Sequence, residues 1–467
     1  MTARSAAAIG VLGAGYMGLA TGLAFAHRGW RVVAFDTNPR VLTALREGRS
    51  PYREAGLNEL LRSETSRRRF KPVSTIDELV GEAAAIFVCL PTPRGPGGRI
   101  DLRPMRSGLR SLGGAIRKAR GYRLVVIKST VVPGTTASVL APLLRRIAGR
   151  SAASLGVAVN PEFLAEGTMV RDALTPERVV IGADDPRAAR RLRAIFRPFR
   201  VPILELPPSG AELVKYASNA FLATKVSFAN ELARLSEALA QNVDDVVAAV
   251  GADSRIGPRF LRAGPGFGGS CFDKDVRALV ARARELGVRF RTGESALATN
   301  DDQLRHVLRL VEREAGRLRG KTVTVLGLSF KAGTDDVRES RALPIVASLR
   351  AKRARVRVHD PVALANFRLA WVREGWGDVT DFAATRSVVS ALRGSDLAVL
   401  QADWPEYRKW SPRWTAAMRT PKLLDLRRAL SPSTARRVGL ELRALGVGEP
   451  RGPMTPPTRR PSRRRKR

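Results

Sequence analysis

Short apolar runs alternate with helical patterns along the first 205 residues of the chain. The first run, at 8–12, precedes a glycine-rich turn and an apolar helical pattern that extends to about Arg28. Short apolar runs bounded by turn residues are typical of buried strands. Strands that alternate with helices indicate a doubly wound, mostly parallel sheet, so we predict a first α/β domain over 1–205. The same pattern predicts further strands at 31–35, 85–90, 123–128, 155–159 and 178–182.

The pattern changes near residue 206. Pro207 and Pro208 interrupt it, and the spacing of Ser209 and Glu212 is that of a capping box at the start of a helix. A long helical pattern continues to about Gln241, and helical patterns dominate to residue 318. We therefore predict a helical middle domain over 206–318, which contains a long central helix and is a candidate dimerisation domain.

A second α/β pattern follows over 319–447. From 448 to 467 the chain is rich in proline and arginine and has no periodicity, which predicts a basic disordered tail. The predicted fold class is α/β, with two Rossmann-like doubly wound parallel sheets joined by the long central helix. Strands of the second sheet are predicted at 322–326, 356–359, 397–400 and 422–424.

Composition narrows the class of protein. The chain has 467 residues, 44% of them hydrophobic and 27% charged, which excludes wholesale disorder. Two cysteines cannot build a disulfide framework or a zinc finger, and only three histidines disfavour a multi-histidine metal site, so we expect no metal. No uninterrupted run of about 18 apolar residues occurs, so we expect no membrane span. The cytoplasm is the default compartment and is consistent with two reduced thiols.

The formal net charge is +38. One interpretation is a solvated surface in an arginine-rich protein, and the other is an anionic partner such as a nucleotide, a nucleic acid or a membrane surface. No nucleic-acid recognition motif or interleaved aromatic pattern accompanies the charge. Nonspecific binding of anions by the basic tail remains a separate hypothesis.

A dinucleotide-binding fingerprint follows the first predicted strand. Gly13 allows a tight turn, Gly15 allows close approach of a pyrophosphate, and Gly18 allows close packing of helix and strand. Asp36 ends the second strand, where a carboxylate binds a ribose diol and repels a 2′-phosphate, so NAD is favoured over NADP. A glycine-rich turn in an ordinary α/β sheet is the alternative. Thr92 follows the next strand and lies where ligand crevices form.

A glycine-rich loop at 264–269 precedes a cysteine. Ser270, with Asp273 three residues on, predicts an N-cap and places Cys271 in the first helical turn. A helix N-terminus and a nearby lysine favour the thiolate, so we expect the pKa of Cys271 to be lowered. Asp275 falls on the same helical face, and a thiolate beside a carboxylate suits covalent catalysis followed by hydrolysis. The alternative is a small side chain packed beneath the loop.

Three further groups are candidates for chemistry. Lys215 and Asn219 share one face of the long helix, where a cation and an amide can hold an oxyanion or simply be solvated. Glu162 and Glu166 follow a predicted strand and can act as acid/base groups or mark a turn. Thr130 follows the end of another strand.

Together these stretches resemble the UDP-glucose/GDP-mannose dehydrogenase family over roughly residues 7–430. The resemblance implies an NAD-dependent, four-electron oxidation of a nucleotide sugar, in which an alcohol becomes a carboxylate through a thiohemiacetal and a thioester on the cysteine. The motifs that carry it are GAGYMG (13–18), CLPTP (89–93), KSTVVPGT (128–135), NPEFLAEG (160–167), KYASN (215–219), RIGPRFLRAGPGFGGSCFDKD (255–275) and GLSFKAGTDDVRES (327–340).

The resemblance also implies a role for each matching residue. Cys271 would be the nucleophile, Lys215 and Asn219 would stabilise oxyanions, and Asp275, Glu166 and Thr130 would position water. In relatives the arginine matching Arg255 comes from a second subunit, which implies a homodimer. The implied NAD contacts are Gly13, Gly15, Tyr16, Met17, Gly18, Asp36, Thr92 and Thr130. The implied substrate contacts are Glu162, Phe163, Leu164, Glu166, Lys215, Asn219, Arg255, Phe260, Leu261, Gly268, Phe330, Lys331 and Arg427.

Substrate choice is less closely specified. The stretch 160–182, with Gly167 after the second glutamate, is most similar to family members that act on UDP-glucose; GDP-mannose and UDP-N-acetylmannosamine are the alternatives. Leu426 stands where the family often has glycine, which leaves the role of Arg427 open. A two-electron 3-hydroxyacid dehydrogenase is the rival enzyme class, and it requires neither Cys271 nor a second α/β domain.

Overall fold

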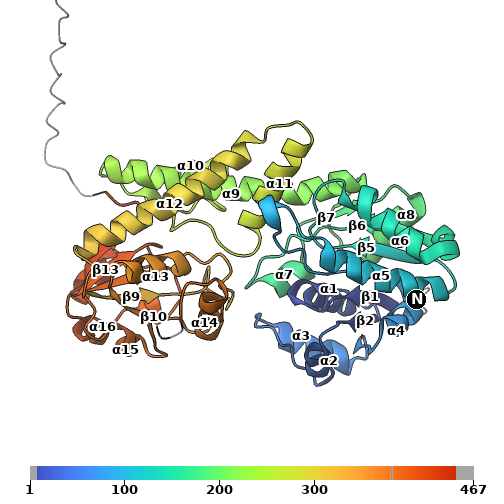
Figure 1. Ribbon diagram of the computed structural model, residues 1–467, viewed down its shortest axis with the longest axis horizontal. Helices are drawn as coiled ribbons and strands as arrows, with labels where there is room; N and C mark the ends of the chain where they lie inside the picture. The colour runs from blue at the N-terminus through green and yellow to red at the C-terminus, as the bar shows by residue number, and fades with distance from the viewer. Residues whose placement is uncertain (1–7, 379, 381, 449–467) are drawn as a thin grey trace, which may run out of the picture.

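The computed structural model describes residues 8–378, 380 and 382–448. The predicted tail, apart from Gly448, therefore lies outside the described residues. Figure 1 shows two α/β lobes, each built around its own sheet, with the long helix α9 (Pro208–Ala238) extending across both. The predicted fold class is confirmed: two Rossmann-like sheets are joined by a long central helix.

The first lobe is built on an eight-stranded sheet with the order β3-β2-β1-β4-β5-β6-β7-β8. Apolar side chains pack on both faces of its inner strands, which explains their nearly continuous apolar sequences. One pairing, between β6 and β7, is antiparallel, so β7 and β8 run against the other strands. The strands are β1 (Ala8–Leu12), β2 (Val32–Phe35), β3 (Phe70–Pro72), β4 (Ala83–Val88), β5 (Arg123–Ile127), β6 (Leu155–Val159), β7 (Val179–Gly182) and β8 (Ile203–Leu206).

The two strands that the sequence pattern missed, β3 and β8, lie at the edges of this sheet. They are short and partly exposed, so they lack the apolar signal of the inner strands. The helices of this lobe are α1 (Tyr16–His27), α2 (Pro39–Arg46), α3 (Leu57–Ser66), α4 (Ile76–Glu82), α5 (Arg103–Lys118), α6 (Ala141–Ala148), α7 (Met169–Leu174) and α8 (Pro186–Phe196).

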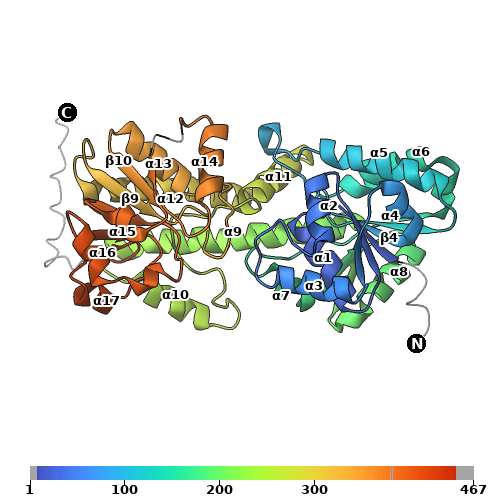
Figure 2. The ribbon, with the colours of Figure 1, turned by 90° about the horizontal axis from the view of Figure 1, so that it is seen from below.

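Four helices form the middle of the molecule. Figure 2 shows α9 passing from one lobe to the other. The other three are α10 (Val243–Ala252), α11 (Phe272–Glu285) and α12 (Arg291–Ala315). The predicted capping box is wrong: α9 begins at Pro208, and Glu212 instead accepts hydrogen bonds from the backbone of Gly134 and Thr136, at 2.6 and 2.9 Å. Glu212 therefore fixes the loop that follows β5 against α9.

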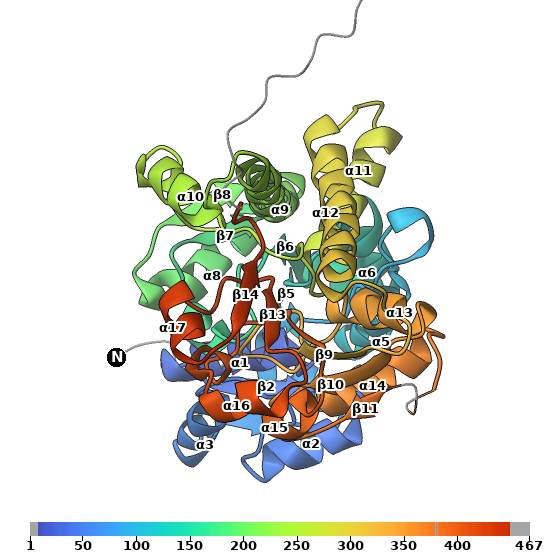
Figure 3. The same ribbon diagram turned by 90° about the vertical axis from the view of Figure 1, so that its left-hand side faces the viewer.

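The second lobe contains a six-stranded parallel sheet with the order β11-β10-β9-β12-β13-β14. Figure 3 shows α9, α10 and α12 lying above this sheet. The strands β11 and β14, again at the edges, were not predicted. The strands are β9 (Thr322–Leu326), β10 (Arg355–His359), β11 (Ala383–Ala384), β12 (Leu397–Leu400), β13 (Lys422–Asp425) and β14 (Glu441–Ala444); the helices are α13 (Ala342–Ala351), α14 (Leu364–Arg373), α15 (Val388–Leu392), α16 (Pro412–Ala417) and α17 (Pro432–Arg437).

Within the described part of the chain, every helix is too short or too polar to cross a lipid bilayer.

Candidate active site

The glycine-rich loop between β1 and α1 has the geometry of a dinucleotide site. Gly13 has φ +95°, and a Cβ there would lie 2.7 Å from the carbonyl oxygen of Cys89. A Cβ at Gly18 would lie 1.9 Å from the carbonyl oxygen of Gly13, so only glycine permits this packing. At Gly15 a Cβ would meet no described heavy atom within 4 Å, so internal packing does not require that glycine. An approaching phosphate at the N-terminus of α1 does explain it.

Asp36 lies directly opposite this loop. One carboxylate oxygen accepts a 2.8 Å hydrogen bond from the Ala14 amide, and the other accepts one of 2.8 Å from the Asn38 amide. These bonds fix the carboxylate at the end of β2, and each oxygen keeps a lone pair for a ribose hydroxyl. The residues therefore fit NAD, whose pyrophosphate would lie at the start of α1 and whose adenosine ribose would face Asp36.

The remaining residues predicted to contact NAD surround the same edge of the sheet. Tyr16 begins α1, its ring lies 4.6 Å from that of Tyr52, and Met17 packs against the core of the lobe. Thr92 and Thr130 are half-buried in the segments after β4 and β5. Tyr16 also reaches the second lobe, because its hydroxyl donates a hydrogen bond to Asp335.

Cys271 lies at the start of α11, but not where the sequence placed it. The helix begins at Phe272, so Cys271 itself occupies the N-cap position and Ser270 precedes it. The Ser270 hydroxyl lies 3.5 Å from the sulfur. The Cys271 carbonyl accepts the amide of Asp275 at 2.8 Å, which places those two residues one turn apart on the same side of the helix, as predicted.

The prediction of a lowered pKa for Cys271 is wrong. The residue is exposed by surface area, yet protein surrounds the sulfur closely enough that desolvation raises its pKa, and the carboxylates of Asp275 and Glu162 raise it further. Lys215 and the Ser270 hydroxyl oppose the shift without reversing it. The resting group is therefore a thiol that becomes an anion only when a proton is removed.

Lys215 and Glu162 form a largely buried ion pair, with 3.0 Å between Nζ and the carboxylate. Burial alone would raise the pKa of Glu162, but Lys215 and the amide of Leu164, 2.6 Å away, outweigh it and lower the pKa. Burial likewise disfavours the Lys215 ammonium, but Glu162, Cys271 and Asp275 raise its pKa. Phe163 lies beside the pair, its ring centre 5.6 Å from the Lys215 nitrogen.

Asn219, one turn beyond Lys215 on α9, meets the same cluster. Its amide donates a 2.7 Å hydrogen bond to Asp275, and Lys274 pairs with the other carboxylate oxygen at 2.6 Å. The sequence interpretation had not singled out Lys274, because its motif shows only that a lysine is near the cysteine. The predicted catalytic side chains Lys215, Asn219, Asp275 and Cys271 thus converge from α9 and α11.

Glu166 takes a different position from Glu162. It faces the loop after β9 in the second lobe, 3.4 Å from both the Thr334 hydroxyl and the Arg338 guanidinium. Burial and the neighbouring carboxylate of Asp336 raise the pKa of Glu166 to about 7, against the opposing charge of Arg338. A carboxyl that titrates near neutrality is suited to accept and release a proton.

Several of the predicted substrate contacts meet where the loop before α11 touches the second lobe. A Cβ at Gly268 would lie 2.2 Å from the Glu339 carbonyl oxygen, so this close approach requires glycine. The ring of Phe330 packs beside Gly269, and the Lys331 nitrogen lies 5.5 Å from the centre of that ring. Burial lowers the pKa of Lys331. Leu261 is buried in the core of the second lobe.

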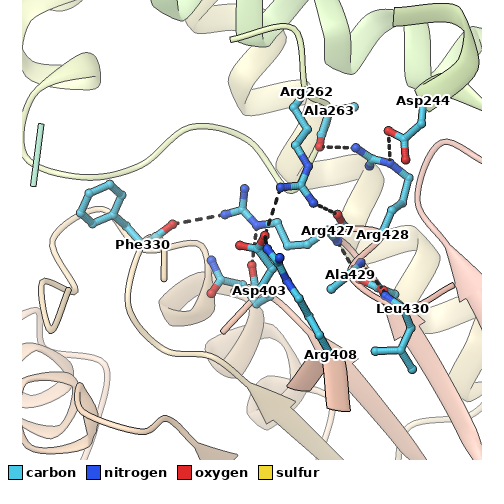
Figure 4. Close-up of polar contacts among 12 residues, drawn as sticks. Asp244, Arg262, Ala263, Phe330, Asp403, Arg408, Arg427, Arg428, Ala429 and Leu430 are labelled. Atoms are coloured by element: carbon cyan, nitrogen blue, oxygen red, sulfur yellow. Dashed lines mark hydrogen bonds and ion pairs between the residues drawn. The ribbon is translucent and has the colours of Figure 1, made fainter. Parts of the chain in front are cut away.

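Arg427 lies at the end of β13 within a group of arginines around Asp403 (Figure 4). Its guanidinium donates to the carbonyls of Gln401 and Phe330, at 2.7 and 3.2 Å, and burial lowers its pKa to about 10. Arg262 pairs with Asp403 at 3.0 Å and donates to the Arg427 carbonyl. Arg262 was not predicted, although an arginine inside the motif 255–275 was a visible signal.

Leu426, at the position where the family often has glycine, is buried in the core of this lobe. Two predicted substrate residues, Arg255 and Phe260, have exposed side chains. Arg255 is exposed and pairs with Asp253. Phe260 is also exposed, with φ +65° and its ring 6.1 Å from that of Phe272. Within one chain the structure therefore does not bring Arg255 to Cys271.

The arrangement combines a glycine-rich loop suited to a dinucleotide with a group of reactive side chains. This group contains the Cys271 thiol, the Asn219 amide and two ion pairs, Lys215–Glu162 and Lys274–Asp275. Such a set can polarise a carbonyl group, supply a sulfur nucleophile that attacks it, and exchange protons with water.

Comparison with known proteins agrees with this geometry. Three domain models of the UDP-glucose/GDP-mannose dehydrogenase family match the chain: the NAD binding domain at 7–200, the central domain at 209–302 and the UDP binding domain at 324–432. The UDP binding domain matches most of the second sheet, from β9 to β13, which a simple hydroxyacid dehydrogenase does not require.

Individual relatives match over nearly their full lengths. A UDP-glucose 6-dehydrogenase of Haloferax volcanii is 39% identical over 443 residues, which are 94% of this chain and 99% of the relative. A UDP-glucose 6-dehydrogenase of Bacillus subtilis is 34% identical over 94% of this chain and 97% of its own. The structure of a UDP-glucose dehydrogenase from Pyrobaculum islandicum superposes with a TM-score of 0.87 at 37% identity, covering 96% of this chain and 99% of that one.

Proposed function

Since the chain belongs to the UDP-glucose/GDP-mannose dehydrogenase family and is an NAD-dependent nucleotide-sugar dehydrogenase, we propose that it oxidises UDP-glucose to UDP-glucuronate with Cys271 as the nucleophile. The observation that carries the proposal is the convergence of Cys271, Lys215, Asn219 and Asp275. Oxidation of an alcohol to an aldehyde needs no thiol, whereas oxidation to the acid is assisted by a covalent adduct.

The residues that would hold NAD are Gly13, Gly15, Tyr16, Met17, Gly18, Asp36, Thr92 and Thr130. When bound, the cofactor would supply the acceptor for each of the two hydrides that leave the sugar carbon. The fixed carboxylate of Asp36 would bind the ribose diol, and the N-terminus of α1 would bind the pyrophosphate. We therefore assign 1–205 to NAD, 206–318 to the helical centre and 319–447 to the UDP-sugar.

Cys271 would act on the aldehyde formed in the first oxidation. Its sulfur forms a bond to the aldehyde carbon, and the carbonyl electron pair moves to oxygen, which gives a thiohemiacetal. Loss of the second hydride gives a thioester, and water then adds and displaces the sulfur, which leaves a carboxylate and a thiol. Because the resting thiol has a raised pKa, a base must take its proton during the attack.

The surrounding residues supply charge and proton acceptors for these steps. The Lys215 ammonium, kept charged by Glu162, and the Asn219 amide stabilise negative charge on the sugar oxygen. Asp275, held between Asn219 and Lys274, positions the hydrolytic water near the sulfur. Glu166 and Thr130 would assist with water, and the pKa of Glu166 allows it to release or take a proton near neutrality.

Residues from both lobes would contact the substrate. UDP-glucose is favoured because relatives that are 34–39% identical to this chain are named UDP-glucose 6-dehydrogenases. GDP-mannose and UDP-N-acetylmannosamine are the alternatives. The proposed substrate contacts beyond the catalytic cluster are Glu162, Phe163, Leu164, Phe260, Leu261, Gly268, Phe330, Lys331 and Arg427.

A second copy of the chain would complete this site. Large apolar side chains are exposed along one side of α9 and at Leu239, which directly follows it; Phe221 is 65% exposed and Leu239 is 68% exposed. In chain order these residues are eight, seven, seven and four positions apart, so they share one stripe of the helical surface. Such an unpartnered stripe marks an interface, so we propose a homodimer in which Arg255 reaches the partner's site. The stripe comprises Leu213, Phe221, Phe228, Leu235 and Leu239.

The experiment that tests the function is a stoichiometric assay with purified protein. UDP-glucose, GDP-mannose and UDP-N-acetylmannosamine are each supplied in limiting amount with excess NAD, and NADH is measured by absorbance. We expect two NADH for each UDP-glucose consumed, with UDP-glucuronate as product. One NADH for each substrate, with accumulation of aldehyde, would overturn the proposal, and turnover of another sugar alone would change the assigned substrate.

A further inference from the structure

A second buried lysine lies beside the proposed catalytic cluster. Lys128 follows β5 directly, and its side chain is buried. Its ammonium donates a 2.8 Å hydrogen bond to the side-chain oxygen of Asn160, which follows β6. The Asn160 amide in turn donates a 2.7 Å hydrogen bond to the carbonyl of Val180 on β7. Three adjacent strands thus fix the position of one lysine nitrogen.

The Lys128 ammonium interacts with the carboxylate of Glu162 at longer range than an ion pair. Around Cys271, Lys215 pairs with Glu162 and Lys274 pairs with Asp275, so these four charges cancel in pairs. The cations of Lys331 and Arg338, on the second-lobe side, also interact with the Cys271 sulfur. Among the described residues no carboxylate forms an ion pair with Lys128, and its hydrogen-bond partner is a neutral amide. Burying a lone ammonium is costly, so a purely structural role would be served better by an apolar side chain.

We propose that Lys128 is a positioning residue for the reaction at Cys271. Its ammonium, fixed by Asn160, adds a positive charge to the cluster, which favours an anionic sulfur and a developing alkoxide. It acts through Glu162, which lies two residues beyond Asn160 and carries the ion pair with Lys215. The inference rests on the proposed function, because it assigns Lys128 to the chemistry of the Cys271 thiol.

The groups that act on Lys128 come from each element packed against it. They are Cys89 after β4, Glu162 after β6 and Lys215 on α9. Burial lowers the pKa of Lys128 to about 8, while Cys89 and Glu162 oppose the shift and Lys215 adds to it. The Lys128 charge is therefore present at neutral pH and is lost as the pH rises through about 8, so its contribution should decline over that range.

The test measures the rate at which iodoacetamide alkylates Cys271, because this rate follows the thiolate fraction. The full-length protein is used without ligands, and mass spectrometry confirms that the buried Cys89 is not the modified residue. In Lys128→Met we expect the rate at pH 7.5 to fall about three- to tenfold, because the variant loses one charge that acts on Glu162 and Lys215, the two residues that act on Cys271 in turn. Lys128→Arg should keep most of the wild-type rate.

A second variant keeps the test informative if Lys128→Met does not fold. Asn160→Asp preserves shape and adds a carboxylate beside Lys128, so it should also slow alkylation. Lys422→Met removes a paired lysine in the second lobe and should leave the rate unchanged. Thermal unfolding identifies the folded variants. If either folded test variant reacts at the wild-type rate, the assignment of Lys128 is overturned.

The same experiment separates this inference from the proposed function. If wild-type protein alkylated at Cys271 still forms UDP-glucuronate, the covalent mechanism fails whatever the Lys128 variants do. If alkylation abolishes acid formation while the variants react normally, the mechanism stands and only the role of Lys128 fails.

Discussion

The hydroxyl of Tyr16 donates a 3.3 Å hydrogen bond to a carboxylate oxygen of Asp335, across 319 residues of sequence. Tyr16 belongs to the glycine-rich segment of the first lobe, whereas Asp335 lies in the loop that follows β9 in the second. The bond therefore joins the loop that would hold NAD to the loop beside the proposed nucleotide-sugar contacts Phe330 and Lys331.

Replacement of Tyr16 by phenylalanine should weaken the coupling between the two ligands. The loss of one such hydrogen bond costs about 0.5–1.5 kcal/mol, so the gain in UDP-glucose affinity produced by bound NAD should fall by up to about tenfold. Isothermal titration with each ligand alone and in the presence of the other measures this coupling. Tyr52→Phe, which keeps the ring beside Tyr16, is the control. Undiminished coupling in Tyr16→Phe would show that the bond has no such role.

The two cysteines should respond differently to alanine substitution. Cys271→Ala should abolish acid formation while the fold and the affinity for NAD are kept. Cys89→Ala should keep the two-NADH stoichiometry and lose stability on the order of 1 kcal/mol, because Cys89 packs in the core of the first lobe. Product analysis and thermal unfolding distinguish the two. Normal UDP-glucuronate production by Cys271→Ala would contradict the covalent mechanism.

Substitution of Asp36 by alanine should weaken NAD binding. The change removes the carboxylate that faces the ribose and also frees the amides of Ala14 and Asn38. NAD affinity should fall by about one to two orders of magnitude, as for a charged hydrogen bond of about 1.5–3 kcal/mol, and any preference against NADP should weaken. Fluorescence titration with both cofactors measures this. Asp77→Ala, at an exposed ion pair, is the control, and an unchanged cofactor profile would refute the ribose assignment.

Glu166 should make folding stability depend on pH. The pKa of Glu166 is raised in the folded protein from 4.5 to about 7. Between about pH 4.5 and pH 7 the folded state therefore binds the proton more tightly than the unfolded state does. The stability contributed by protonated Glu166 is therefore complete below about 4.5 and is lost as the pH rises through 7. In the wild-type protein the free energy of unfolding should therefore decline between about pH 4.5 and pH 7. Glu166→Gln should remove this decline, which is on the order of 1 kcal/mol or more. Urea unfolding at pH 5 and pH 8 measures it, and identical pH dependence in both proteins would contradict the prediction.

The apolar stripe on α9 should hold two copies of the chain together. Phe221→Arg places a charge on that stripe, so we expect monomers and a loss of activity through the absent Arg255 of the second copy. Sedimentation analysis and the NADH assay test this together. Leu369→Arg, at an exposed apolar residue on α14, is the matched control and should change neither property. A fully active monomer of Phe221→Arg would refute the shared site.

The sequence alone identified most inner strands of both sheets, because strands buried on both faces are apolar throughout. It missed β3, β8, β11 and β14, since edge strands are short and carry mixed polarity. Helical spacing put Asp275 beside Cys271 and Asn219 beside Lys215, but only the family resemblance joined the two pairs in one site. The sequence did not single out Lys128, Arg262 or Lys274, because a charged residue in a sequence does not show whether it is solvated or buried.

What the sequence determined by itself was the order of elements, the glycine geometry at Gly13 and Gly18, and the identity of the reactive side chains, since these depend on residue type and local spacing. Only the tertiary structure decided the charge state of Cys271, the separation of Glu162 from Glu166 and the partner of Glu212. These depend on burial and on carboxylates and cations brought together from distant segments. Coulomb and desolvation energies follow distances in space, and distances along the chain do not specify them.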